Sequence, residues 1–292
     1  FGAQTPCAGA DFLTVERSHE MSTAIERAQS GGHSEMRMER AGREYQFDIS
    51  RIEAGGTVIL AFDVTEQEYA ERSRREFTAN VSHELKTPLQ GIIGSAELIE
   101  NGMVKPADLP RFAGHIRAEA ARLVTLIDDI IRLSQLDEGG ALPTEEVDVY
   151  TQAAEAVKSL QSAAAAKDVT LTLTGESTRI PGVQRLTYEI IFNLCDNAIK
   201  YNREGGRVDV SVAREGAGAV VTVADTGIGI APEHQQRIFE RFYRVDKSHS
   251  KASGGTGLGL SIVKHAVQYL NGSIALKSEP GKGTTVSVSL PG

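Results

Sequence analysis

The chain has 292 residues and a formal net charge of −8, from 31 basic and 39 acidic residues. That length suits two or three domains, and an acidic chain without a basic stripe argues against direct binding of nucleic acid. No apolar run reaches the roughly 18–20 residues of a membrane span, and no signal-peptide pattern opens the chain, so we expect a soluble fragment. Cys7 and Cys195 form no metal-binding or disulfide pattern, which is typical of a reducing cytoplasm.

The first 65 residues mix helix and strand signals. Strands are predicted over 42–48 and 57–63, with a turn at Gly55-Gly56 between them. A long helix follows, with Thr65 as its expected N-cap, and apolar residues recur at helical spacing until Asn101-Gly102.

A second amphipathic helix is predicted after Pro106 and Pro110, ending within 137–140. Its apolar residues follow a heptad-like spacing: Ile116, Ala120, Leu123, Ile127 and Ile130. A single helical hairpin buries such a stripe poorly, so the pattern predicts a homodimer held by a four-helix bundle. A monomeric hairpin packed on the rest of the chain is the alternative.

From about residue 145 the pattern changes to interleaved helices and mostly antiparallel strands, which indicates an α+β two-layer sandwich. Strands are expected over 147–149, 169–173, 207–213, 219–224, 273–278 and 284–290, and helices over 153–166, 184–201 and 258–270.

The first motif with chemical content is Ser82-His83-Glu84-Leu85-Lys86-Thr87-Pro88. His83 should point away from the apolar face of its helix, and an exposed neutral imidazole is a competent nucleophile near neutral pH. Glu84 can hold one ring nitrogen and leave the other free to attack, while Thr87 lies one helical turn further on. A surface histidine before a helical proline is, taken alone, also a common structural feature.

The second motif runs from Asn193 to Tyr201 on a helix. Asn193, Asn197 and Lys200 share one helical face, where amide oxygens suit Mg²⁺ and a lysine can meet a phosphate. A polar helix face capped by Asn202 is the simpler alternative.

Two glycine-rich loops and an aromatic segment complete the pattern. Asp225 ends a strand before Gly227 and Gly229, where a carboxylate can accept from an adenine amine, or where the strand simply turns. The loop 254–260 opens a helix, and its amides suit phosphate binding, although it is neither a Walker nor a dinucleotide motif. Between them, 238–246 alternates aromatic and charged residues, as a helix end also would, and the polar run 246–253 is expected to form a lid.

In this order the motifs resemble the H, N, G1, F and G2 boxes of two-component sensor histidine kinases, over residues 66–292. The resemblance implies a dimerisation and phosphotransfer domain at 66–138 and a Bergerat-type ATP-binding domain at 145–292, with ATP and Mg²⁺ as cofactors and a response regulator as partner. Residues 1–65 resemble the later part of a PAS domain, because Asp63-Val64-Thr65 leads directly into the long helix. The layout is similar to the phosphate-responsive or cell-wall sensor kinases of bacteria, which implies the cytoplasmic portion of a membrane-anchored sensor.

The resemblance also implies residue roles. His83 would be the phosphoacceptor, Glu84 its acid–base partner and Thr87 a residue that positions water for a phosphatase reaction. Asn197 would bind Mg²⁺ and Asp225 would read adenine. The remaining predicted ATP-site residues are Asn193, Lys200, Tyr201, Gly227, Gly229, Arg244, Gly255, Thr256, Gly257, Leu258 and Gly259.

Two other functions compete with that of a kinase. One is a different Bergerat-fold ATPase, such as a chaperone or a DNA topoisomerase or repair subunit, against which the box at His83 argues. The other is a non-enzymatic PAS dimer module, which would require degenerate nucleotide motifs, whereas these are intact.

Overall fold

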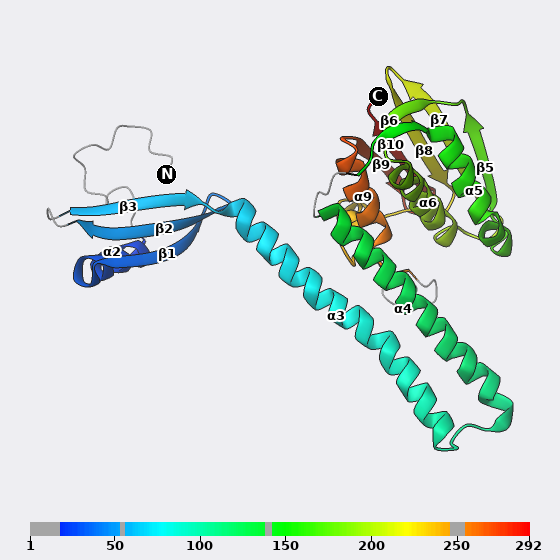
Figure 1. Cartoon of the computed structure of the whole chain (residues 1–292), viewed down its shortest axis with the longest axis horizontal. Coiled ribbons are helices and arrows are strands. Elements are labelled where there is room, and N and C mark those ends of the chain that lie inside the picture. Colours follow the sequence, from blue (N-terminus) through cyan, green and yellow to red (C-terminus); the bar gives the residue numbers. More distant parts are fainter. Residues whose placement is uncertain (1–17, 53–55, 138–141, 246–254) are drawn as a thin grey trace. The chain divides into compact units, whose positions relative to one another are not determined.

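The computed structural model describes residues 18–52, 56–137, 142–245 and 255–292 (Figure 1). The chain forms two compact units, Phe1–Val81 and Ser82–Gly292, and the boundary falls within one long helix. The expected turn at Gly55, the expected lid at 246–253, and Cys7 and Gly254 lie outside the described residues. No helix in the described ranges is long and apolar enough to cross a membrane.

The first unit contains a helix packed on an antiparallel three-stranded sheet of order β1-β2-β3. Met21, Phe47 and Ile49 form the centre of its core. The two predicted strands are present, but the helix and the first strand were not predicted separately. The elements are α2 (His19–Gly31), β1 (His33–Arg40), β2 (Arg43–Ile52) and β3 (Gly56–Asp63).

Helix α3 (Thr65–Glu100) begins where sequence analysis expected, but Thr65 does not cap it. Thr65 is its first helical residue, and the carboxylate of Asp63 accepts from both the Thr65 amide, at 3.1 Å, and the Thr65 hydroxyl, at 2.6 Å. The cap thus comes from the end of β3, because an acidic oxygen satisfies a free amide of the first turn. These hydrogen bonds lower the pKa of Asp63 from its ordinary value.

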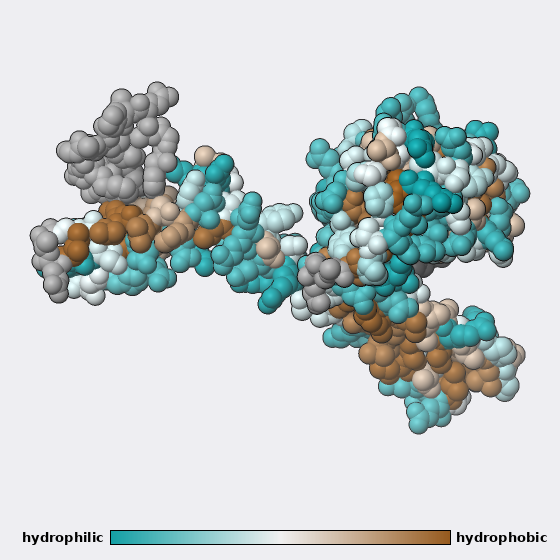
Figure 2. Space-filling view, turned by 45° about the horizontal axis from the view of Figure 1, so that its top comes forward, coloured by the Kyte–Doolittle hydropathy of each residue, from teal (hydrophilic) through white to brown (hydrophobic). Residues whose placement is uncertain are grey.

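The second unit begins with a helical hairpin. Helix α3 continues through Pro88 and ends at Glu100, and after the short turn η1 (Pro106–Asp108) helix α4 runs over Leu109–Asp137, as predicted. Apolar side chains stay exposed on this hairpin, where Figure 2 shows a continuous hydrophobic surface. They include Leu89, Ile93, Leu98, Val124, Ile127 and Ile131.

The rest of the second unit is a two-layer α/β sandwich, which confirms the predicted fold class. Its mixed sheet has the order β5-β7-β8-β10-β9, with only the β5–β7 pair parallel, and α5, α6 and α9 form the helical layer (Figure 1). Strand β6 pairs with β4 in a separate ribbon and was not predicted. The elements are β4 (Glu145–Asp148), α5 (Val149–Ala166), β5 (Thr170–Gly175), β6 (Arg179–Gly182), α6 (Gln184–Lys200), β7 (Arg207–Glu215), β8 (Gly218–Asp225), α7 (Pro232–Gln235), η2 (Arg237–Phe239), α9 (Gly259–Tyr269), β9 (Ser273–Glu279) and β10 (Gly283–Leu290).

The core of the sandwich lies between the sheet and the helices. Helix α5 starts four residues earlier than predicted, because Asp148 caps it by accepting from the amides of Tyr150 and Thr151. Cys195 is fully buried on α6, and burial raises the pKa of its thiol to about 12, as for a small apolar core residue. The core residues include Leu186, Ile190, Ile191, Val208, Val210, Val221, Val223, Ile262, Val263 and Val288.

Candidate active site

His83 lies on an exposed face of α3, as its position between the half-buried Val81 and Leu85 predicts. The hydroxyl of Thr87, also exposed, donates to the His83 carbonyl oxygen at 3.2 Å. Thr87 therefore borders the histidine as its helical spacing predicts, and Pro88 beside it is buried. The imidazole remains accessible for attack on an incoming group.

Glu84 connects the hairpin to the sandwich. One of its oxygens, Oε2, lies 3.7 Å from Arg122 on α4 and 3.5 Å from Arg244 in the segment after η2. The motif predicts that this carboxylate holds the ring of His83, and that role stays a prediction. Arg122 was not predicted, since no motif marks it.

The predicted residues on α6 face the start of α9. A Cβ on Gly259 would crowd Oδ1 of Asn193 at 2.9 Å and would lie at an ordinary contact distance of 3.8 Å from Nδ2 of Asn197, so the first turn of α9 lies against both amides. Lys200 forms an ion pair with Asp196 at 2.6 Å, one turn earlier. The helix N-terminus, two amides and a lysine thus gather at one end of the helical layer.

Asp225 ends β8 and uses one oxygen for the fold. Its Oδ1 accepts from the amides of Gly227, at 2.7 Å, and Thr284, at 3.2 Å. Burial raises the pKa of Asp225, and these two amides oppose the rise. Because both hydrogen bonds fall on Oδ1, Oδ2 is the oxygen available to accept from a bound base.

The two glycines after Asp225 are required by close backbone approaches. A Cβ on Gly227 would lie 2.4 Å from the carbonyl oxygen of Tyr201, and one on Gly229 would lie 2.0 Å from that of Glu279. Gly229 also has a φ of 68°, which strains other residues. The loop is therefore pressed against both α6 and the β9–β10 hairpin, and this brings Tyr201 to the side of Asp225.

Asn202 supports the same loop and was expected only to cap α6. Its buried side chain donates to the Arg207 carbonyl at 3.0 Å and accepts from the Arg203 amide and from the Thr226 hydroxyl. Tyr201, not Asn202, is the residue that ends the helix. The pattern of polar residues was visible in the sequence, but its partners were not.

Arg244 and the second glycine-rich loop are held together. The side chain of Arg244 is 9% exposed and donates to the Gly255 carbonyl, while the Phe242 amide donates to the Gly257 carbonyl at 2.9 Å. Burial lowers the pKa of Arg244, and Glu84 opposes this shift, so the guanidinium stays charged in a partly dry site. Gly257 has a φ of 77°, and a Cβ there would crowd Phe242 and Arg244.

Thr256 and Leu258 lie in this loop but contact the protein. The hydroxyl of Thr256 donates to Asp129 of α4 at 2.7 Å and accepts from the Leu258 amide at 3.2 Å. Leu258 is fully buried at the N-terminal end of α9. Both residues shape the loop, and the sequence had marked them only as members of the ATP site.

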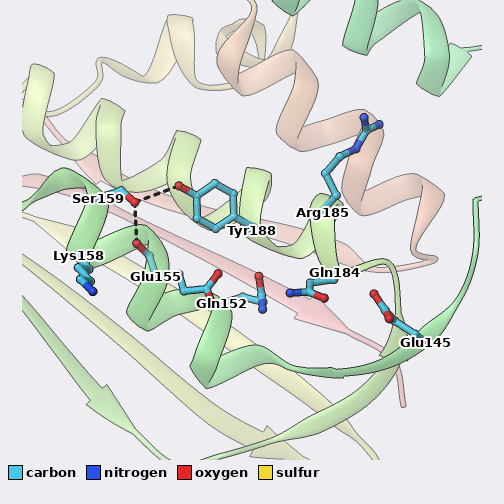
Figure 3. A pocket seen from close by; sticks show the side chains of 8 residues that line it. All are labelled: Glu145, Gln152, Glu155, Lys158, Ser159, Gln184, Arg185 and Tyr188. Carbon is cyan, nitrogen blue, oxygen red and sulfur yellow. Dashed lines mark hydrogen bonds between the residues drawn. The ribbon is translucent and has the colours of Figure 1, made fainter.

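The site offers donors for a polyanion and a hard cation. Amide oxygens on α6 are suitable Mg²⁺ ligands beside phosphate, and the described residues hold no cluster of three or more His, Cys, Asp or Glu side chains that could bind a metal without such help. A hollow of about 840 Å³ lies elsewhere, on α5 and α6, and contains none of the predicted site residues (Figure 3). Tyr188 and Ser159 are hydrogen-bonded across it at 3.3 Å.

The fold joins a two-layer sandwich, which carries two glycine-rich loops, to a hairpin that exposes a histidine. Residues 73–139 match the His Kinase A (phospho-acceptor) domain, and residues 182–292 match the family of histidine kinase-, DNA gyrase B- and HSP90-like ATPases. The sensor-like histidine kinase SenX3 of Mycolicibacterium smegmatis is 42% identical over 236 residues, which cover 80% of this chain and 62% of that protein. The chain thus spans about three fifths of the length of the first curated relatives.

Solved structures agree with the fold. Histidine kinase ThkA, in complex with response regulator protein TrrA, has a TM-score of 0.61 at 20% identity, covering 96% of this chain and 85% of that one, and shows the fold alone. Full-length ShkA, in complex with AMPPNP, has a TM-score of 0.56 at 27% identity, covering 74% of this chain and 45% of that one. By its two matched domains and its relatives, the chain belongs to the two-component sensor histidine kinases.

Proposed function

We propose that the chain is an ATP-dependent protein-histidine kinase that phosphorylates His83 and passes the phosphoryl group to an aspartate of a response regulator. The observation that carries the proposal is the 3.5 Å contact between Glu84, next to the histidine, and Arg244, next to the glycine-rich loop. It joins an accessible nucleophile to the domain that matches nucleotide-binding ATPases.

The chemistry follows from the residues. A ring nitrogen of His83 attacks the γ-phosphorus of ATP, the bond from that phosphorus to the β–γ bridging oxygen breaks, and ADP leaves with the electron pair. Glu84 balances the positive charge that develops on the imidazole. In the second step a carboxylate oxygen of the regulator attacks the same phosphorus, and the imidazole leaves.

Nucleotide binding is assigned residue by residue. Oδ2 of Asp225 accepts from the adenine amine and Tyr201 lines the base pocket, while Lys200 and Arg244 bind phosphates. Asn197, with Asn193 nearby, holds Mg²⁺, which neutralises phosphate charge when bound. Loops shaped by Gly227, Gly229, Gly255, Thr256, Gly257, Leu258 and Gly259 enclose the phosphates, and the AMPPNP complex of ShkA supports this use of the fold.

The working form is proposed to be a homodimer. The exposed apolar surface of the hairpin, with Val124 59% and Ile131 50% exposed, suits a second copy that completes a four-helix bundle. Residues 66–138 then form the dimerisation and phosphotransfer domain, 145–292 the ATP-binding domain, and 1–65 a PAS-like sensor segment. Membrane anchoring through segments upstream of Phe1 belongs to the same proposal.

Labelled ATP with Mg²⁺ tests the kinase assignment. The chain should acquire an acid-labile, base-stable phosphate that maps to His83, and His83→Gln should abolish labelling while the Kd for ATP stays unchanged. Another ATPase of this fold would hydrolyse ATP without forming phosphohistidine. Labelling of His83→Gln at the rate of the unmodified chain would overturn the proposal.

A further inference from the structure

Hydrogen bonds and ion pairs join the nucleotide-binding sandwich to the helical hairpin of the same chain. All of them lie within the compact unit Ser82–Gly292. On the sandwich side, three of them come from the segment 241–244, the loop 255–258 and α9, which border the proposed phosphate site. Two more come from α6, where Arg185 contacts Gln135 at 3.2 Å and Glu189 contacts Arg132 at 3.6 Å. On the hairpin side they come from Glu84 and from α4.

The contact nearest the nucleophile is the ion pair of Glu84 and Arg244. Arg122 approaches the same carboxylate oxygen from α4, so two guanidinium groups share one carboxylate. The cluster keeps an excess positive charge one residue from His83. A positively charged cluster attracts the terminal phosphate of a nucleotide held by the sandwich. Arg244 contributes to this cluster from the same chain as His83.

Asp129 makes the second contact, with the glycine-rich loop. Its Oδ2 accepts from the Thr256 hydroxyl at 2.7 Å, and the contact is half-buried. Burial raises the pKa of Asp129, which Thr256 opposes. A hydrogen bond that is partly shielded from water is stronger than a solvent-exposed one, so this contact aligns the loop with α4.

A third contact lies at the C-terminal end of α4. Arg241 donates from one nitrogen to both carboxylate oxygens of Asp137, at 2.7 and 2.8 Å. The same nitrogen lies 3.1 Å from Nε2 of His265 on α9. These residues belong neither to the predicted nucleotide-contacting set nor to the histidine motif, so a substitution here tests docking without removing a predicted ATP contact.

We propose that each chain phosphorylates its own His83, within the subunit, and that these contacts dock its nucleotide site onto its own hairpin. The inference rests on the proposed kinase function. Only seven residues, 138–144, separate α4 from β4, and they reach at most about 28 Å when fully extended. Transfer to the partner's histidine would break all three contacts and carry Arg244 away from the Glu84 beside which it lies.

Mixed dimers decide between the two routes. One heterodimer pairs a His83→Gln chain with an Asp225→Ala chain, purified through two different affinity tags. Within-subunit transfer leaves both chains unlabelled, because one lacks the nucleophile and the other lacks the base contact. Labelling of the Asp225→Ala chain would overturn the proposal.

The matched control pairs an unmodified chain with a chain that carries both substitutions. Within-subunit transfer labels the unmodified chain at the rate of one active subunit, whereas transfer between subunits leaves it unlabelled and overturns the proposal. An unlabelled dimer of two unmodified chains would instead overturn the kinase assignment itself. The Asp225→Ala homodimer, which should stay unlabelled, confirms that the substitution inactivates the site.

Asp137→Asn tests whether the docked arrangement is productive. It removes the charge that holds Arg241, and we expect autophosphorylation to slow about fivefold, as for loss of a partly exposed ion pair, with the KM for ATP unchanged. Asp128→Asn, at an exposed position on the same helix, is the matched control and should keep the unmodified rate. A rate that is unchanged or higher in Asp137→Asn would show that the contacts restrain the kinase or are idle, and would overturn the docking role.

Discussion

Asp225→Asn should replace one carboxylate acceptor with an NH₂ donor at the predicted base contact, while the hydrogen bonds that hold the local fold remain. The amides of Gly227 and Thr284 both donate to Oδ1, and in the variant they hold the asparagine oxygen there. An NH₂ group then replaces Oδ2, and it donates where the carboxylate accepted. We therefore expect ATP, with its adenine amine, to bind more weakly and GTP, with a carbonyl at the same position, to bind relatively better.

The magnitude follows from the group that is lost. A hydrogen bond to a charged acceptor contributes about 1.5–3 kcal/mol, which corresponds to a rise of roughly 10- to 150-fold in the Kd for ATP. The fold should not suffer at pH 7, because burial raises the pKa of Asp225 and so disfavours its ionised form in the native state. Replacing the carboxylate with a neutral amide should therefore raise the free energy of unfolding at pH 7. This increase should vanish below the ordinary aspartate pKa, where the carboxyl group is protonated in both the folded and the unfolded state.

The assay is competition of ATP and of GTP against a fluorescent nucleotide, with urea unfolding at pH 7 and at pH 3 as the test of the fold. Glu215→Gln, exposed at the end of β7, removes a charge elsewhere and should change neither Kd. An ATP-to-GTP preference in Asp225→Asn equal to that of the unmodified chain would refute the base-reading role of Asp225.

Three further predictions concern the loop, the phosphatase reaction and the dimer. Gly229→Ala forces a Cβ to within 2.0 Å of the Glu279 carbonyl oxygen at a positive φ, so it should lower the free energy of unfolding by well over 1 kcal/mol. Gly281→Ala, which has open space around it at a similar φ, should lower that free energy less. Equal losses of stability in urea unfolding would contradict the steric argument. Thr87→Ala should keep autophosphorylation and lose most phosphatase activity, because the hydroxyl can orient water whereas the imidazole attacks with its own lone pair. The measurement is the decay of regulator phosphate with the unmodified chain and with the variant. Equal decay rates for the two proteins would rule out this role for Thr87. Val124→Glu places a charge on the apolar hairpin surface, at a side chain that is 59% exposed, and should convert the proposed dimer to a monomer. Light scattering measures the molar mass. A dimer that persists in the variant would locate the interface elsewhere.

The sequence alone determined the elements that have strong periodicity. Helices α4 and α6 and strands β7 to β10 lie where spacing placed them, because long amphipathic patterns and clear glycine turns need no tertiary partner to be recognised. Strand β6, which contains Pro181, was missed, since four residues carry too little pattern. The start of α5 was misplaced because Asp148 caps it before the alanine-rich stretch begins.

The predicted site residues also rest on local sequence, since each box is a continuous motif, and their roles stay predictions. The glycines at 227 and 229 were marked, but the reason for them was not. They were predicted as members of the ATP site, and the fold shows that carbonyl oxygens of Tyr201 and Glu279 lie within 2.4 Å of the places where a Cβ would be. Backbone approaches between distant segments leave no periodic signal.

Only the tertiary structure decided how the two domains meet. Arg122, Asp129 and Asp137 look like ordinary polar residues on an amphipathic helix, and nothing in their spacing indicates a partner. Their contacts join residues that lie far apart in the chain, such as Asp129 with Thr256 and Asp137 with Arg241, and partial burial strengthens the first of these. A one-dimensional pattern records which face of a helix is polar, but the partner of that face depends on packing of the whole unit.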